Sequence, residues 1–139
     1  MVSYAGDVAP SDAWADLDRE SGAQLVDVRT RPEWAFVGVP DLAPVRKKVI
    51  LLPWQDYPTM QVNPNFIAEL ERAVPDKSAP VYFLCRSGAR SRAAAIAATE
   101  AGYQRCYNVS DGFEGTLDGA RHRGRAAGWK AAGLPWLQD

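Results

Sequence analysis

The sequence predicts an α/β fold in which helices cover both faces of a central parallel sheet. Short apolar runs alternate with helical segments along the 139 residues, and the apolar residues within each run are adjacent instead of alternating. Adjacent apolar residues indicate a strand buried on both faces, as in a parallel sheet between two layers of helices. Because a chain of this length suits one hydrophobic core, we expect a single domain over residues 1–139.

Four apolar runs predict strands, because they are rich in β-branched or aromatic residues and too short for helices. In chain order these runs span residues 24–28, 49–52, 81–85 and 106–109.

Three further segments predict helices, and they span residues 10–18, 63–74 and 91–101. In the second helix Asn63 is the expected N-cap and Pro64 the first helical residue. The third helix is rich in alanine and is expected to stop at Gly102, which suits a left-handed C-terminal cap.

Charge and composition exclude several classes of protein. The 16 Lys and Arg residues nearly balance 17 Asp and Glu, so the net charge of −1 gives no field that favours nucleic acid or an anionic membrane. Hydrophobic residues, at 47%, are too frequent for a disordered chain. Two cysteines are too few for a disulfide scaffold, and no Cys and His group has zinc-site spacing. With no leader-like start and no apolar stretch of the ~20 residues that cross a bilayer, the sequence predicts a cytoplasmic protein.

The turn between the third predicted strand and the helix that follows it is where we expect chemistry. Ligands of open α/β sheets sit beyond the carboxyl ends of the strands, where helix N-termini offer unpaired N–H groups. Cys85 lies at this strand end, and the helix dipole together with Arg86 and Arg90 favours its thiolate form. We therefore expect Cys85 to be nucleophilic near neutral pH.

Glycine and serine complete this turn. Gly88 permits backbone angles at which successive N–H groups point inward around an anion. Ser87 and Ser91 can add hydroxyl donors or cap the helix. The segment therefore predicts a small, positively polarised bowl around the thiol.

The run Cys-Arg-Ser-Gly-Ala-Arg-Ser at residues 85–91 resembles the active-site loop of rhodanese-like sulfurtransferases. The resemblance extends over most of the chain and implies a rhodanese-like α/β domain, with a central parallel sheet of about five strands flanked by helices on both faces. The flanking segments that share it are Asp27-Val28-Arg29 followed by Glu33-Trp34, Gly112-Phe113-Glu114-Gly115, and Gly-Trp-Lys-Ala-Ala-Gly-Leu-Pro at residues 128–135.

This resemblance implies a thiosulfate sulfurtransferase that works by double displacement. Catalytic Cys85 would take sulfur from thiosulfate or a related anionic donor, hold it as a persulfide, and pass it to cyanide, a thiol or a protein acceptor. No metal and no organic cofactor is needed. The residues that would bind substrate are Arg86, Ser87, Gly88, Ala89 and Arg90, and those that would support the loop are Asp27, Arg29 and Ser91.

Two departures from the family pattern concern substrate contacts. The family often has Gly-His-Ile where this chain has Gly38-Val39-Pro40, so the contact of that histidine is unassigned. Residues 116–125 lengthen the connection between the two C-terminal motifs, and substrate access could differ there.

Two other functions compete with sulfur transfer. A cysteine phosphatase would also place a thiolate beneath an arginine, but such enzymes have a longer loop than the four residues between Cys85 and Arg90. They also often carry histidine where this chain has Leu84. A non-enzymatic rhodanese-like module for binding or sulfur relay is the other alternative, although the presence of the loop cysteine favours catalysis.

Several residues have both a structural and a functional interpretation. Asp27 and Arg29 are expected to form an ion pair that holds the loop, with a direct catalytic role as the alternative. Cys106 is expected to pack in the core, too far from Cys85 for a disulfide because the two cysteines lie at opposite ends of neighbouring parallel strands.

Aromatic and basic residues outside the loop are further candidates. Trp54 and Phe113 follow predicted strands and are candidate pocket walls. His122 lies among Arg121, Arg123 and Arg125. These residues form either a solvated basic loop or a guide for an anionic substrate or an acidic partner.

Overall fold

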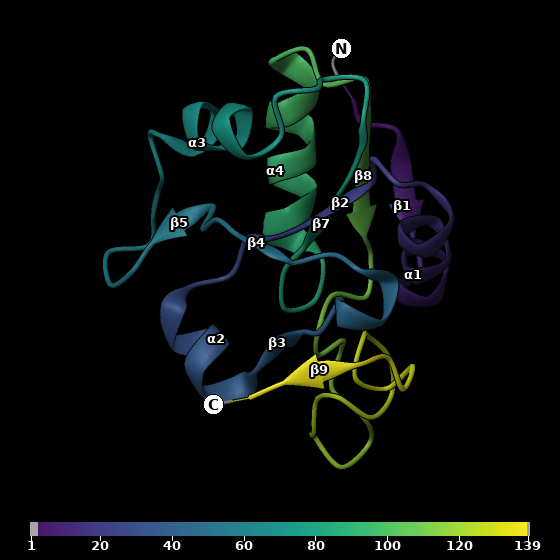
Figure 1. The fold of residues 1–139 in the computed structure, drawn as a ribbon. Coiled ribbons are helices and arrows are strands. Elements are labelled where there is room, and N and C mark those ends of the chain that lie inside the picture. The colour runs from purple at the N-terminus through teal and green to yellow at the C-terminus, as the bar shows by residue number, and fades with distance from the viewer. Residues whose placement is uncertain (1–2, 139) are drawn as a thin grey trace.

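A computed structural model describes residues 3–138, which form a five-stranded central sheet (Figure 1). The strand order is β1-β8-β7-β2-β4, and all neighbouring strands are parallel. The predicted α/β class with a central parallel sheet is therefore confirmed. The strands are β1 (Gly6–Val8), β2 (Gln24–Asp27), β4 (Ile50–Leu51), β7 (Pro80–Leu84) and β8 (Arg105–Val109).

Helices cover both faces of this sheet. The side chains of β7 show this, because successive residues point into two different hydrophobic cores. Val81 and Phe83 belong to one cluster of buried residues, which also holds side chains of the helices α3 (Phe66–Ala73) and α4 (Ala89–Glu100). Tyr82 and Leu84 belong to a second cluster, together with side chains of helix α1 (Pro10–Arg19). Burial on both faces explains why the strand is apolar throughout. The helices are α1 (Pro10–Arg19), α2 (Arg31–Val37), α3 (Phe66–Ala73) and α4 (Ala89–Glu100), and a 3-10 turn spans Ala43–Val45.

The predicted start of the second helix is wrong, because α3 begins at Phe66 and its N-cap is Asn65. Asn63 instead closes the turn before the helix: its Oδ1 accepts the N–H of Asn65 at 3.0 Å, and its Nδ2 donates to the carbonyl of Pro53 at 3.1 Å. Such side-chain bonds compete with helical ones at asparagine.

Several short elements were not predicted. β1 starts at a glycine, carries Asp7, and lies at the sheet edge, so it lacks the apolar pattern of the inner strands. α2 buries none of its side chains and therefore shows no apolar stripe. Two-residue strands give no readable alternation, and they form two antiparallel pairs: β3 (Val39–Pro40) with β9 (Trp136–Leu137), and β5 (Gln55–Asp56) with β6 (Gln61–Val62).

These additional elements lie where the site is expected. Figure 1 shows α2, β3 and β9 gathered at one end of the sheet, the end to which the arrow of β8 points. Parallel strands bring their carboxyl ends to the same edge, so the loop after β7 opens toward these elements. No helix among residues 3–138 is long and apolar enough to cross a membrane.

Packing of α3 on the sheet is testable through Leu70, which is fully buried. Leu70→Ala is expected to lower the free energy of unfolding by about 2–5 kcal/mol, because it removes apolar contacts and leaves a cavity. Urea denaturation measures this change. The matched control is Glu71→Ala, which breaks an exposed ion pair with Lys77 and should cost less than about 1 kcal/mol. Equal losses in the two variants would contradict this account of the core.

Candidate active site

The loop after β7 is fixed by a glycine that no other residue can replace without strain. Gly88 is the N-cap of α4 and has a φ of 117°, in the left-handed region. A Cβ added there would overlap the carbonyl oxygen of Ser110. The chain can therefore leave β7, turn, and enter α4 directly over the end of the sheet.

The thiol of Cys85 lies inside this turn. The Gly88 N–H donates a hydrogen bond to Sγ at 3.1 Å, and the hydroxyl of Ser91 lies 3.2 Å from the same atom. The bowl predicted from the sequence therefore has two donors in contact with sulfur among the described residues. Cys85 is also only 1% exposed, so the thiol is less accessible than the sequence suggested.

A polar chain extends from the thiol into the sheet. Ser91 Oγ lies 2.5 Å from Asn108 Oδ1, and Asn108 Nδ2 donates to Asp7 Oδ1 at 3.1 Å. The Asp7 carboxylate accepts only, so it orients the amide nitrogen of Asn108 toward itself and the oxygen toward Ser91. The single hydroxyl proton of Ser91 can be donated to Asn108 when Cys85 is a thiol, or to the sulfur when Cys85 is a thiolate.

The turn at residues 112–115 holds the cysteine loop in place through backbone hydrogen bonds. The carbonyl of Cys85 accepts the N–H of Phe113 at 2.8 Å, and the carbonyl of Arg86 accepts the N–H groups of Glu114 and Gly115 at 3.0 and 3.1 Å. A Cβ on Gly112 would overlap the backbone of Arg86. The motif at residues 112–115 therefore serves as a backbone support for the cysteine loop.

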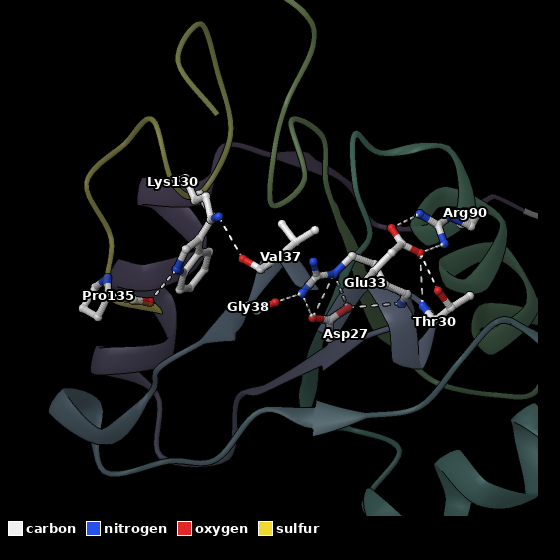
Figure 2. Close-up of polar contacts among 10 residues, drawn as sticks. Asp27, Thr30, Glu33, Val37, Gly38, Arg90, Lys130 and Pro135 are labelled. Carbon is white, nitrogen blue, oxygen red and sulfur yellow. Dashed lines mark hydrogen bonds and ion pairs between the residues drawn. The ribbon is translucent and has the colours of Figure 1, made fainter. Parts of the chain in front are cut away.

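Arg90 has a carboxylate partner that the sequence analysis did not assign. Its guanidinium pairs with Glu33 through two bonds of 2.7 and 2.8 Å (Figure 2). Glu33 Oε1 also accepts the N–H and hydroxyl of Thr30, which forms a capping box at the start of α2. Burial alone would raise the pKa of Glu33, but the bonds and charge of Arg90, with the bonds from Thr30, lower it to about 2. The charge of Arg90 is thus largely offset by Glu33.

Asp27 and Arg29 form the expected ion pair, and both side chains are fully buried. Arg29 Nη2 contacts Asp27 at 2.6 Å and also donates to the carbonyl of Gly38 at 2.7 Å. The guanidinium lies 4.3 Å from the centre of the Phe113 ring. Figure 2 places Asp27 near Gly38, so this pair joins the end of β2 to the end of α2. That the pair supports the cysteine loop stays a prediction.

A pocket of about 480 Å³ opens where the loop meets α2 and the C-terminal segment. Trp54 and Phe113 do not line it, so their prediction as its walls was wrong. Trp54 packs edge-on against Phe66 at 5.1 Å, and Phe113 is fully buried beneath Arg29. The lining residues are Glu33, Val37, Gln55, Met60, Arg86, Arg90, Glu114 and Arg123.

Comparison with known proteins gives the family. A family model described as the STR4 middle domain matches residues 5–139. The chain belongs to this family. It is a rhodanese-like domain, as the resemblance predicted, with sulfurtransferases among its more distant relatives.

Three similar proteins show how far the likeness extends. The crystal structure of Rv0390 from M. tuberculosis has a TM-score of 0.90 and 52% identity, covering 99% of this chain and 100% of that one. The uncharacterized protein RC0915 of Rickettsia conorii is 43% identical over 93% of this chain and 94% of its own length. Thiosulfate sulfurtransferase GlpE of Actinobacillus pleuropneumoniae is 26% identical over 93% of this chain and 90% of its own.

The other residues of this rhodanese-like domain that were candidates for a functional role differ in where they lie. Cys106 is buried in the core and in register with Val81, near the start of β7, whereas Cys85 follows the end of that strand. Both cysteines are free, as predicted. His122 is exposed, while Arg123 reaches the pocket. Among residues 3–138, no group of three or more His, Cys, Asp or Glu side chains is placed to hold a metal ion.

Sequence reasoning missed the polar partners of the rhodanese-like loop. Asn108 and Asp7 come from β8 and β1, and only the pairing of these strands brings them behind Ser91, so no local signal reveals them. Glu33 was noted only as part of a motif. Its spacing from Thr30, as a capping box, could have predicted both the start of α2 and the position of this carboxylate.

The contact between Ser91 and sulfur predicts an effect on thiolate reactivity. In a Cys106→Ala background, Ser91→Ala should slow alkylation of Cys85 by iodoacetamide about tenfold at pH 7, because a hydroxyl donor to the charged sulfur is lost. Mass spectrometry follows the rate. Ser21→Ala in the same background changes an exposed serine outside the loop, so it is the matched control and should react at the parental rate. Equal rates in both variants would contradict a role for Ser91 at the sulfur.

The lowered pKa of Glu33 predicts a pH-dependent contribution to stability. Because the folded-state pKa is about 2 and the ordinary value 4.5, ionised Glu33 stabilises the fold fully above pH 4.5, and this contribution is lost as the pH falls toward 2. Thermal unfolding should therefore show that Glu33→Gln is less stable than the parent at neutral pH and that the difference shrinks over this interval. Exposed Glu100→Gln is the control. A constant difference between parent and Glu33→Gln at all pH values would refute the assignment.

Proposed function

We propose that this rhodanese-like domain is a sulfurtransferase, which moves sulfane sulfur from an anionic donor such as thiosulfate to a nucleophilic acceptor through a persulfide on Cys85. The observation that carries the proposal is the sulfur of Cys85 held by the Gly88 amide and the Ser91 hydroxyl, next to a pocket whose lining includes three arginines. Similarity to thiosulfate sulfurtransferase GlpE supports the same chemistry. We also propose that residues 1–139 form one domain.

In the first step the Cys85 thiolate attacks the outer sulfur of thiosulfate. A new sulfur–sulfur bond forms as the donor's own sulfur–sulfur bond breaks, and sulfite leaves with the electron pair. In the second step cyanide, a thiolate or a protein acceptor attacks the outer sulfur of the persulfide, and Cys85 is released as a thiolate. The sulfur is carried without a net change in the oxidation state of the enzyme.

The proposed roles of the other residues follow from where they lie. Arg86 would neutralise the donor and the leaving sulfite, as a cation facing developing negative charge. Arg90 would assist it through hydrogen bonding, because its charge is largely offset by Glu33. Backbone N–H groups of the loop would receive the transferred sulfur, and residues 86–90 are therefore the proposed substrate-binding set. Asp27, Arg29 and Ser91 would hold this loop in position.

A non-enzymatic module for binding or sulfur relay is the second candidate, and one observation favours the binding form, because a relay needs access to the sulfur just as an enzyme does. Cys85 is 1% exposed, so a small donor reaches Sγ only if the loop or its cover moves. A module that only binds a partner through the same pocket would need no such movement. Turnover with a small donor distinguishes the two.

The deciding experiment combines turnover with intact mass. The purified domain is expected to gain one sulfur on incubation with thiosulfate and to transfer sulfur to cyanide, and Cys85→Ser should abolish both. Cys106→Ala is the matched control and should retain both, because that thiol packs in the core. Turnover that survives in Cys85→Ser would exclude the proposed nucleophile. Hydrolysis of a phosphate ester without sulfur uptake would indicate a phosphatase, and neither activity in the parent would favour the binding module.

A further inference from the structure

The segment 116–125 brings an arginine to the pocket beside the cysteine loop. Arg123 is half-buried and lines that pocket together with Arg86 and Arg90. Arg121 and Arg125 belong to the same segment, but both are exposed and neither lines the pocket. The three arginines of the segment are therefore not equivalent, because Arg123 alone among them lines the pocket.

The position of Arg123 is fixed by hydrogen bonds. Its Nη1 donates to the carbonyl of Gly115 at 2.7 Å, and the N–H of the next residue, Gly124, donates to the carbonyl of Glu114 at 2.6 Å. Asp118 orders the preceding turn by accepting the N–H of His122 at 2.8 Å. Since Nη1 is the only guanidinium nitrogen of Arg123 that is bonded among residues 3–138, its other N–H groups are available to a ligand.

Arg123 determines whether the lining of the pocket carries a net positive charge. Arg90 is paired with Glu33, so the charge of each is largely offset by the other. Among residues 3–138, neither Arg86 nor Arg123 forms an ion pair. Three guanidinium groups thus face two carboxylates, those of Glu33 and Glu114, and without Arg123 the lining would carry no net charge.

The two ends of a thiosulfate-type donor, its outer sulfur and its oxyanion, require different partners in the site. The outer sulfur must meet Cys85, while an oxyanion at the other end of a thiosulfate-type donor needs a cation that is not already neutralised. Arg86 is one such cation, and it is exposed. Arg123 is the other, and it is half-buried and held in place, which makes its interaction with an anion less screened than that of a solvated side chain.

We propose that Arg123 is a donor-binding residue that holds the oxyanion end of the sulfur donor and so selects donors of the thiosulfate class. This inference rests on the proposed sulfur transfer. Arg123 holds the donor without contacting the reacting sulfur, so its main contribution is to donor binding and not to the rate of the bound complex.

Steady-state kinetics with thiosulfate tests the proposal. Arg123→Gln is expected to raise KM about tenfold and to leave kcat within about twofold, because uniform binding is lost. Arg121→Gln, which removes an exposed arginine of the same segment, is the matched control and should match the parent. Arg123→Lys keeps the charge and should restore most of the affinity. A KM for Arg123→Gln equal to that of Arg121→Gln, or no recovery in Arg123→Lys, would overturn the proposal.

Direct binding separates this inference from the proposed function. In a Cys85→Ser background, which cannot form a persulfide, calorimetry with thiosulfate should show a Kd about tenfold weaker when Arg123→Gln is added and unchanged when Arg121→Gln is added. Such a result alongside a parent that does not turn over would refute sulfur transfer while retaining the anion site. Turnover by the parent with the same Kd in all three variants would refute the role of Arg123 alone.

Discussion

The site depends on close contact between backbone segments at the carboxyl edge of the sheet. Gly88 lies against Ser110, and Gly112 lies against Arg86, each at a distance that leaves no room for a Cβ. The carbonyls of Cys85 and Arg86 are bound by amides of the turn at residues 112–115. These contacts fix the direction in which the loop carbonyls and amides point, and the N–H of Gly88 is thereby aimed at the sulfur. The backbone of the cysteine loop therefore has a defined position, and the polar groups around the pocket are arranged around it.

How much could be predicted from the sequence follows from which interactions are local. The strand before Cys85 and the helix after it were predictable, because contiguous apolar residues, a glycine turn and a helical segment follow one another within a short stretch. The start of α3 was predicted incorrectly because Asn63 and Pro64 suit a helix start and a turn equally well. The pairing of Arg90 with Glu33 joins residues far apart in sequence, and neither side chain alone indicates the other.

Two ion pairs near the loop illustrate different uses of charge. The pair of Asp27 and Arg29 is fully buried, and Arg29 Nη1 has no hydrogen-bond partner among the described residues, although the Phe113 ring lies beneath the guanidinium. A buried pair of this kind contributes to the definition of geometry more than to net stability, because desolvation offsets much of the attraction. The pair of Arg90 and Glu33 is partly exposed and lines the pocket, so it adjusts the charge that a ligand meets.

Helix α2 is held mainly by polar bonds near its two ends, and Val37 is its one described side chain that packs against a core cluster. Glu33 binds Arg90 near its start, and the carbonyls of Val37 and Gly38 accept bonds from Lys130 and Arg29 near its end (Figure 2), while none of its side chains is buried. Divergence among relatives should therefore be uneven along this helix. Its outward positions, such as Phe36 at 79% exposure, are free to drift during evolution, whereas Glu33 is constrained by a partner on another element.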